Sequence, residues 1–264
     1  MYQLKNELNI PSIGFGTWKI LEENLANTSI QSAVHAGYRL FDTASIYENE
    51  QLIGDALQNS GIARESLFIS GKVWNTDRGY DKTLKAFALS CKKLKVDYMD
   101  CYLIHWPASP FFSEDWAAEN ADTWRALETL YESGVVKSIG VCNYAPVHLD
   151  TLAATANVKP MINQIEFHPG TFPTDIFTYC KKESIQMQAW SPLGNGTLLS
   201  PPLLTKLADK YQKSPAQICL KWCEEKQVIP LPKSVTPERI AANIDLSDFS
   251  LSAEDILTLD TLSL

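Results

Sequence analysis

The sequence predicts an α/β protein that forms a closed (β/α)8 TIM barrel, with an N-terminal β-hairpin at the barrel bottom. Two observations support this fold class. Short apolar segments alternate with longer amphipathic segments eight times along the 264 residues. The apolar segments are rich in Ile, Leu, Val and aromatic residues without polar alternation, as parallel strands buried on both faces are. Composition does not change abruptly anywhere, so we expect one domain over residues 1–264.

Eight apolar segments are expected to form the barrel strands. They cover residues 12–18, 38–44, 67–74, 99–106, 137–143, 161–167, 185–190 and 228–234. Alternation of strands and helices implies right-handed crossovers, which make all of these strands parallel in one sheet. Ahead of them, residues 2–10 contain two short extended halves around Lys5 and Asn6, a pattern typical of a hairpin.

Helical patterns separate these strands. Residues 49–61, 81–94 and 123–134 have apolar side chains at helical spacing, and a glycine ends the first and the last of them. Residues 236–246 open with Thr236 as an N-cap, followed by Pro237 in the first turn. Residues 106–120 are expected to form a long loop after the fourth strand, and such loops are usually functional.

Composition and charge disfavour several classes of protein. The formal net charge of −8 makes the chain a poor general binder of nucleic acid or anionic lipid. It has no apolar run of eighteen residues and no signal-peptide core, so we expect a cytoplasmic protein that contacts no membrane. The six cysteines form no Cys-x-x-Cys pair, and Cys219 and Cys223 have core spacing on a helix, which disfavours a disulfide or a metal site.

Polar or aromatic side chains stand at the end of every predicted strand. The C-terminal strand ends of a barrel meet at one rim, where its active site lies. Asp42 ends the second strand and Tyr47 follows it, Lys72 lies in the third strand, and His105 ends the fourth. The other strand ends contribute Trp18, Trp74, Trp106, Cys142, Asn143, Gln164, Trp190, Ser191, Lys233 and Ser234. This coincidence predicts a single site rather than a solvated rim.

Lys72 and Asp42 lie on neighbouring strands and are expected to pair beside Tyr47. A nearby ammonium favours a phenolate, so we expect the pKa of Tyr47 to lie below about 10, which suits a proton donor. His105 could then orient a carbonyl as a neutral donor. The alternatives are a strand-end lysine whose head reaches solvent and a histidine that is hydrogen-bonded in the core.

A metal site is the competing chemistry at this rim. Asp42, His105, Glu166 and His168 are ligand types found in metal-dependent barrel hydrolases. However, the first strand offers no His-x-His, and the chain has only four histidines, of which His35 and His148 lie on helical patterns. We therefore expect no metal.

A phosphate site is predicted at the last strand. The segment GFGTWK lacks the third glycine of a dinucleotide fingerprint. In contrast, Lys233, Ser234 and Arg239 surround the start of the helix at 236–246, and a helix N-terminus with two cations binds anions. Helix capping would explain the hydroxyls of Ser234 and Thr236, but it would not explain the cations.

Eight motifs resemble those of the aldo-keto reductases over nearly the whole chain. They are GFGTW, AGYRLFDTASIYENEQLIG, GKVW, DYMDCYLIHWP, SIGVCNY, NQIEFHP, AWSPLG and PLPKSVTPERIAAN. Each motif alone is weak, whereas the set in this order and spacing is very specific. The pattern is most similar to the bacterial 2,5-diketo-D-gluconate reductase-like members.

The resemblance implies a barrel that binds NADPH without a Rossmann fold and transfers a hydride to an aldehyde or ketone. It implies four catalytic residues, with Tyr47 as the general acid, Lys72 and Asp42 as the pair that tunes it, and His105 as the group that orients the carbonyl. The implied pocket walls are Trp18, Trp74 and Trp106.

The resemblance also implies the cofactor contacts. They are Cys142, Asn143, Gln164, Trp190, Ser191, Leu193, Lys233, Ser234, Arg239 and Asn243. Within this set, Asn143 and Gln164 would hold the nicotinamide amide and Trp190 would stack on its ring. Lys233, Ser234 and Arg239 would hold the adenosine 2′-phosphate, which favours NADPH over NADH, and Asn243 would reach the adenine.

Three residues depart from the family pattern. Gly71 replaces the usual Thr, Cys142 the usual Ser beside Asn143, and Ala242 a common acid near the adenine. The chain also ends soon after a last helical run at Leu264, so we expect an open, permissive pocket. We expect a monomer that acts on a small-molecule carbonyl. The alternative function is a cofactor-binding regulatory subunit on the same fold with little turnover.

Overall fold

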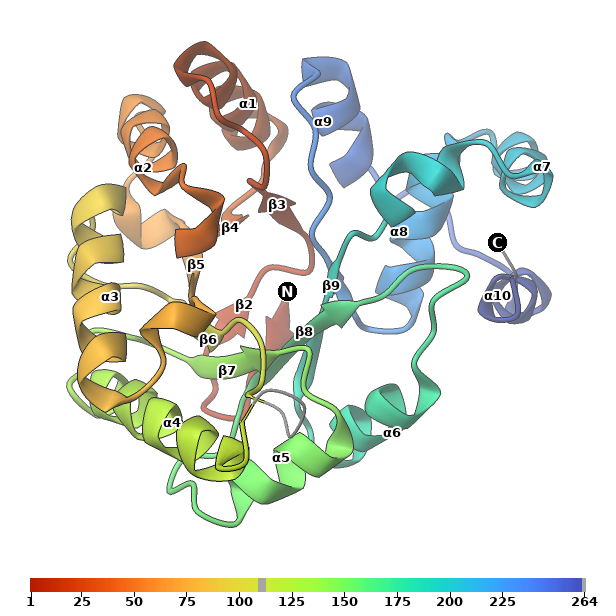
Figure 1. The fold of residues 1–264 in the computed structure, drawn as a ribbon. Coiled ribbons are helices and arrows are strands. Elements are labelled where there is room, and N and C mark those ends of the chain that lie inside the picture. The colour runs from red at the N-terminus through yellow and green to blue at the C-terminus, as the bar shows by residue number, and fades with distance from the viewer. Residues whose placement is uncertain (109–112, 263–264) are drawn as a thin grey trace.

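The computed structural model describes residues 1–108 and 113–262, and its centre is a barrel of parallel strands (Figure 1). The strands form one sheet in chain order: β3 (Gly14–Gly16), β4 (Leu40–Asp42), β5 (Phe68–Val73), β6 (Cys101–Ile104), β7 (Ile139–Cys142), β8 (Ile162–Glu166), β9 (Gln186–Trp190) and β10 (Ile229–Pro230). Every neighbouring pair is parallel. The predicted (β/α)8 fold class is therefore confirmed.

Among the described residues, one backbone hydrogen bond closes the barrel between β3 and the segment that follows β10. The Gly16 N–H donates to the Pro232 carbonyl at 3.0 Å. β10 is shorter than the predicted strand at 228–234 because Pro230 and Pro232 have no N–H to donate to a ladder. The Leu231 N–H still donates to the Ala189 carbonyl of β9 at 3.0 Å, and the chain then passes beside β3.

The N-terminal hairpin lies where the sequence predicts it. β1 (Tyr2–Gln3) pairs antiparallel with β2 (Asn9–Ile10). The Asn6 side-chain amide donates to the Lys137 carbonyl at 2.9 Å, just before β7 begins. The hairpin therefore covers the N-terminal ends of the strands, at the end of the barrel opposite the predicted site.

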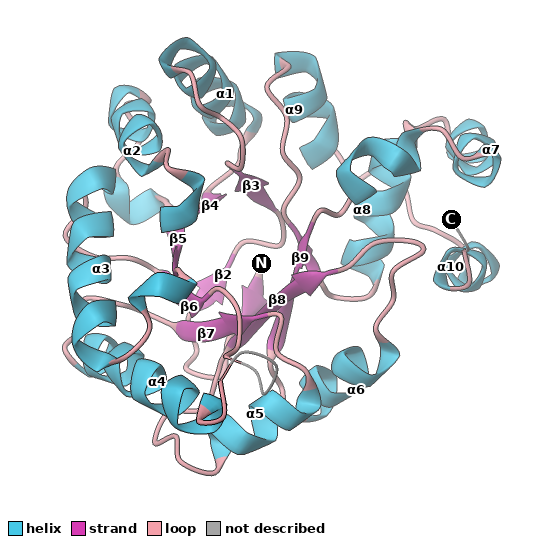
Figure 2. Ribbon diagram, viewed as in Figure 1, coloured by secondary structure: helices cyan, strands magenta, loops and turns pink. Residues whose placement is uncertain are grey.

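Helices surround the strands as an outer ring (Figure 2). They are α1 (Glu23–Ala36), α2 (Glu50–Asn59), α3 (Tyr80–Leu94), α4 (Trp116–Glu132), α5 (Pro146–Ala153), α6 (Thr174–Lys182), α7 (Pro202–Tyr211), α8 (Pro215–Glu225), α9 (Pro237–Ile244) and α10 (Ala253–Asp260). Short 3-10 helices follow three of the strands: η1 (Ser45–Tyr47), η3 (Asn75–Asp77) and η4 (Gly194–Leu199). A further one, η2 (Arg64–Ser66), lies between α2 and β5. Within the two described stretches, no helix is long and apolar enough to cross a membrane.

One expectation about a loop is wrong in part, and one about a helix cap is confirmed in position only. The loop predicted at 106–120 lies partly outside the described residues, at 109–112, and α4 already begins at Trp116. Ala117, Ala118 and Glu119 favour a helix there although the segment has no apolar stripe. Thr236 stands at the N-cap of α9, but its side chain accepts no capping hydrogen bond. Its own N–H is instead held by Ser234 Oγ at 3.1 Å.

The interior of the barrel changes from apolar to polar toward the C-terminal strand ends. The apolar core lies mostly between the strands and the helix ring, where Trp124 and Trp222 are fully buried. Asp42, Lys72 and Gln164 are buried as well, although all three are polar or charged. Buried charges require partners, and the partners of these residues define the site.

Candidate active site

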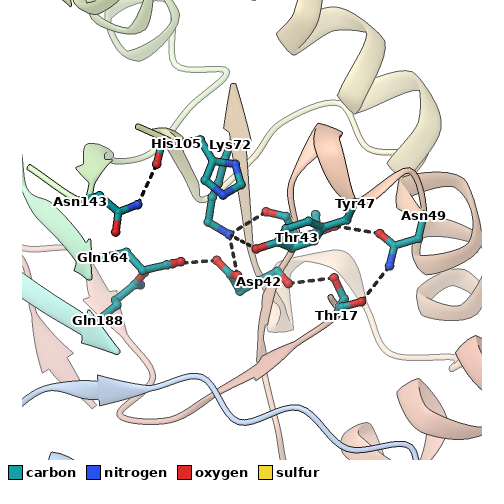
Figure 3. Close-up of polar contacts among 10 residues, drawn as sticks. All are labelled: Thr17, Asp42, Thr43, Tyr47, Asn49, Lys72, His105, Asn143, Gln164 and Gln188. Atoms are coloured by element: carbon teal, nitrogen blue, oxygen red, sulfur yellow. Dashed lines mark hydrogen bonds and ion pairs between the residues drawn. The ribbon is translucent and has the colours of Figure 1, made fainter. Parts of the chain in front are cut away.

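Lys72 and Asp42 form a buried ion pair between neighbouring strands (Figure 3). Lys72 Nζ donates to Asp42 Oδ2 at 2.6 Å and to the Thr43 carbonyl at 3.1 Å. Only 1% of Lys72 and 4% of Asp42 is exposed. The lysine therefore does not extend to solvent, and the pairing agrees with the one predicted from the strand order.

The ammonium of Lys72 stays charged despite its burial. Burial alone would lower its pKa, but the negative charge of Asp42 and the Tyr47 hydroxyl outweigh burial and raise the pKa above 10.5. The pair thus places one permanent cation in the wall of the barrel mouth.

Tyr47 lies in η1, directly after β4, with its hydroxyl against this cation. Lys72 Nζ donates to Tyr47 Oη at 3.4 Å. The prediction of a lowered pKa for Tyr47 is wrong. Burial raises its pKa above 10, and the opposing pull of Lys72 is smaller. Tyr47 is therefore a neutral hydroxyl. Its pKa would be higher still without the nearby charge of Lys72.

His105 follows β6 and faces the same space. Its ring lies edge-on to Tyr47 at 5.9 Å and to Trp74 at 5.0 Å between ring centroids. Burial, and then the Lys72 charge, lower its pKa to about 2, so the imidazole is neutral. Its Nδ1 is buried and has no hydrogen-bond partner in the described parts of the chain. These contacts do not support a hydrogen-bonded core histidine.

A second cluster of polar side chains lies across the barrel mouth, on β8 and β9 and directly after β7. Gln164 Nε2 donates to Asp42 Oδ1 at 2.9 Å and to Gln188 Oε1 at 2.8 Å. Asn143 Nδ2 donates to the His105 carbonyl at 3.0 Å, and Asn143 Oδ1 accepts from Trp190 Nε1 at 2.9 Å. Each predicted amide-binding residue therefore contacts a predicted catalytic residue, Gln164 through Asp42 and Asn143 through the His105 carbonyl (Figure 3).

Three further predicted cofactor residues flank this network. Cys142 ends β7 as a fully buried thiol, and burial raises its pKa well above 9. Ser191 and Leu193 follow β9 and are partly buried. Ser191 has a positive φ of 48°, and its hydroxyl donates to Asn195 Oδ1 at 3.1 Å, so this turn is held internally.

The predicted phosphate residues lie at the other side of the mouth, around the start of α9. Lys233 and Arg239 are exposed, and within the described residues neither forms an ion pair. Burial of its stem and the nearby charge of Lys19 lower the pKa of Lys233. Asn243 is buried one turn after Arg239. Two cations are therefore available here to an anion.

The predicted pocket walls stand on three loops. Trp18 is 46% exposed after β3, Trp106 is 41% exposed after β6, and Trp74 packs against His105 after β5. Arg78 links the last two loops because its guanidinium donates to the Trp106 carbonyl at 2.9 Å.

Sequence and structure comparisons show what kind of protein carries this arrangement. A model of the Aldo/keto reductase family matches residues 12–263. The chain belongs to the aldo/keto reductase family. Glyoxal reductase from Bacillus subtilis (strain 168) is 45% identical over 261 residues, which cover 99% of this chain and 92% of that protein.

Solved structures of this family agree with the barrel. MGS-M4, an aldo-keto reductase enzyme from a Medee basin deep-sea metagenome library, is 42% identical, with a TM-score of 0.92 over 100% of this chain and 95% of that chain. An aldo-keto reductase from Bombyx mori in complex with NADP is 34% identical, with a TM-score of 0.89 over 98% of this chain and 91% of that chain.

Glu166 and His168, which are metal-ligand types together with Asp42 and His105, lie at the end of β8 and in the turn that follows it. His168 is buried in a turn after β8, with Nδ1 at 2.8 Å from the Pro169 carbonyl and Nε2 at 3.7 Å from Glu166 Oε1. Within the described residues, no group of three or more His, Cys, Asp or Glu side chains could hold a metal ion. His105 and His168 belong to different local networks.

Sequence reasoning missed three residues of the site. Gln188 pairs with Gln164 in the strand register, and it precedes Trp190 by two residues, so it points to the same face. Lys19 lies close enough to Lys233 to lower the pKa of Lys233, and it directly follows Trp18, a predicted pocket wall. Asn49 is fully buried two residues after Tyr47, and no local pattern distinguishes it from an ordinary helix start.

Proposed function

We propose that this protein reduces aldehydes and ketones to alcohols with NADPH. One observation carries the proposal: the buried Lys72 ammonium contacts Asp42 and the Tyr47 hydroxyl together, beside a neutral His105. Membership of the aldo/keto reductase family supports it, as does the similarity to the NADP complex from Bombyx mori.

The amide network fits a nicotinamide carboxamide. Both Nε2 hydrogens of Gln164 are already donated to Asp42 and Gln188, whereas its Oε1 accepts no hydrogen bond from a described residue. A carboxamide N–H could donate to that oxygen. Among the described residues, Asn143 Nδ2 donates only to the His105 carbonyl, which leaves one N–H for a ligand. The Asn143 bond to Trp190 holds the indole where it could cover a planar ring.

The exposed cations fit the phosphate groups of the same cofactor. Lys233 and Arg239 have no acidic partner among the described residues, and the charges of Lys19 and Lys233 already repel one another. An anion would relieve that repulsion. An arginine recognises a phosphate through paired N–H donors, so Arg239 supports a preference for the 2′-phosphate of NADPH.

When bound, the reduced nicotinamide supplies the hydride for the carbonyl carbon. Tyr47 gives its hydroxyl proton to the carbonyl oxygen as negative charge develops there. Lys72 stabilises the phenolate that remains, and Asp42 keeps Lys72 in place. His105 is a neutral imidazole, so it can donate one hydrogen bond to the carbonyl oxygen and orient it.

The walls of the mouth favour small apolar or aromatic carbonyls. Trp18, Trp74 and Trp106 surround the entrance and offer apolar surface with few charges. Similarity to a glyoxal reductase supports small dicarbonyl compounds as the first substrates to test.

A Tyr47→Phe variant tests the proposed function. Loss of the hydroxyl proton should lower kcat for glyoxal by about 10²- to 10⁴-fold, measured as NADPH consumption by absorbance. NADPH affinity, measured by quenching of tryptophan fluorescence, should stay at the wild-type level because the cofactor contacts are untouched. The matched control is Tyr98→Phe, which removes a hydroxyl with no hydrogen bond to any described residue and leaves the ring against Arg64.

The two alternatives give different results in this experiment. Wild-type binding of NADPH without turnover of any carbonyl would favour a regulatory subunit on the same fold. Full activity in Tyr47→Phe would exclude Tyr47 as the acid while leaving the reductase class intact.

A further inference from the structure

Asn49 stands at a helix start without capping the helix. It occupies the N-cap of α2, where an asparagine usually accepts a hydrogen bond from the first helical turn. Its side chain makes no such bond. The residue is 0% exposed, so its amide must find partners elsewhere within the protein.

The partners of the Asn49 amide are the two ends of one turn. Its Nδ2 donates to the Thr17 carbonyl at 2.8 Å and to the Ile20 carbonyl at 3.1 Å. The turn between them is closed by the Ile20 N–H, which donates to the Thr17 carbonyl at 3.2 Å. Figure 3 shows the Asn49 side chain directed at Thr17.

The turn from Thr17 to Ile20 contains one residue in a strained backbone conformation. Lys19 has a φ of +62°, in the left-handed region that costs energy for residues other than glycine. The turn carries Trp18 on its outer side, with Lys19 Nζ at 4.2 Å from the Trp18 ring centre. Trp18 is half-exposed and so makes few contacts that could hold the turn by themselves.

Asn49 also connects this turn to the segment that carries Tyr47, the proposed general acid. It follows Tyr47 by two residues, and its Oδ1 lies at 3.5 Å from Thr43 Oγ1. Thr17 in turn donates from Oγ1 to the Asp42 carbonyl at 2.9 Å. The segment from Asp42 to Asn49 therefore holds both the Tyr47 hydroxyl and the Trp18 turn.

We propose that Asn49 is a positioning residue that sets the distance between the Trp18 ring and the Tyr47 hydroxyl, and so selects for carbonyls with an aromatic or bulky apolar group. This selectivity role rests on the proposed function. We call the two hydrogen bonds from Asn49 to Thr17 and Ile20 the tether. Reduction of a carbonyl that reaches Trp18 depends on the tether. Glyoxal is too small to contact much beyond the reacting group, so its reduction depends on the tether much less.

Limited proteolysis tests the tether without any catalysis. Trypsin cleaves after Lys19 only when the exposed turn can leave its conformation. In Asn49→Ala, we expect release of the fragment 1–19 to be accelerated about tenfold relative to wild type, as the loss of one to two hydrogen bonds allows. Mass spectrometry identifies the fragment and separates it from cleavage elsewhere.

Ser138→Ala is the matched control for a general loss of stability. Ser138 is also 0% exposed, and its Oγ donates to the Asp100 carbonyl at 2.6 Å at the opposite end of the barrel. Its loss should accelerate cleavage at all sites together. If the Asn49→Ala protein does not fold, Asn49→Leu replaces it, because it keeps a branched side chain of similar length and removes the N–H donors without burying a charge.

Kinetics with glyoxal and phenylglyoxal test the selectivity role. In Asn49→Ala, kcat/KM for phenylglyoxal should fall about 10- to 100-fold, mainly through KM, as expected for a misplaced wall. The value for glyoxal should change much less. In a Trp18→Ala background, Asn49→Ala should not alter the phenylglyoxal-to-glyoxal ratio further, because the two residues act as one unit.

The possible failures are distinguishable. Equal losses for both substrates, or an unchanged cleavage rate after Lys19, would overturn the positioning role of Asn49. Absence of carbonyl reduction by the wild-type protein would overturn the proposed function instead, and the proteolysis result would then still decide whether the tether exists.

Discussion

Lys72 and Arg239 are both cations at the C-terminal rim of the barrel, but the chain holds them in opposite ways. Lys72 is buried and donates to Asp42, Thr43 and Tyr47. Arg239 is exposed on α9 and forms no ion pair within the described residues. The first cation is fixed before any ligand arrives, whereas the second is free to bind one.

This difference separates two physical roles. A preorganised charge stabilises a transition state without reorganisation at the moment of reaction, and its surroundings must compensate for its burial. An exposed cation contributes little to folding, and its attraction for an anion is screened by salt. Substitutions in the first region should therefore affect folding and chemistry, and substitutions in the second should affect binding alone.

The largest effect is expected for Lys72→Met. It leaves the buried Asp42 carboxylate without its cation, so the free energy of unfolding should fall by about 3–5 kcal/mol, measured by urea denaturation. Activity should fall by about 10²- to 10⁴-fold. The control Lys182→Met removes an exposed lysine at 3.9 Å from Glu183 and should change stability by less than about 1 kcal/mol.

A double variant separates the two effects of Lys72. Asp42→Asn combined with Lys72→Met removes both buried charges and should recover much of the lost stability without recovering activity. Recovery of both would mean that Lys72 contributes only to folding, and the contrast with Arg239 would disappear.

Arg239→Ala should have a smaller and different effect. The affinity for NADPH should fall about 10- to 100-fold, as for the loss of a hydrogen bond to a charged group, with no change in the free energy of unfolding. NADH affinity should change little, and the difference should shrink at high salt. Titration by tryptophan fluorescence measures each cofactor, and the exposed Arg125→Ala on α4 is the control. Equal losses for both cofactors would contradict the assignment of Arg239 to the 2′-phosphate.

The buried region was predictable from the sequence where strand order alone determines contacts. Asp42 and Lys72 had to be neighbours because their strands are consecutive and parallel, and their charges could not be buried separately. The hairpin at residues 2–10 and the rim of strand ends follow from the same local and alternating patterns.

Other properties of the site could not be predicted, because they depend on the extent of burial and on contacts between distant residues, which only the folded chain defines. The pKa of Tyr47 is raised because burial outweighs the Lys72 charge, and neither magnitude is visible in the sequence. The Asn49 amide binds carbonyls 29 and 32 residues away, so its role could not be inferred from its position at a helix start. The helical turns at 116–120 were missed because that segment lacks an apolar stripe.

The smallest effect tests whether His105 is neutral beside Lys72. Its pKa is about 2 in the folded protein, against 6.5 ordinarily. Below about pH 6.5 the unfolded chain therefore binds a proton at this residue that the folded chain does not bind, and stability falls as the pH falls, by up to about 1.4 kcal/mol per pH unit. His105→Gln removes this difference, so its free energy of unfolding should fall less steeply between about pH 6 and about pH 5. The exposed His35→Gln is the control and should keep the wild-type slope. If the free energy of unfolding had the same pH slope in wild type and His105→Gln, His105 would bind its proton in the folded state as it does in the unfolded state. The barrel mouth would then hold two neighbouring cations rather than one cation and a neutral hydrogen-bond donor.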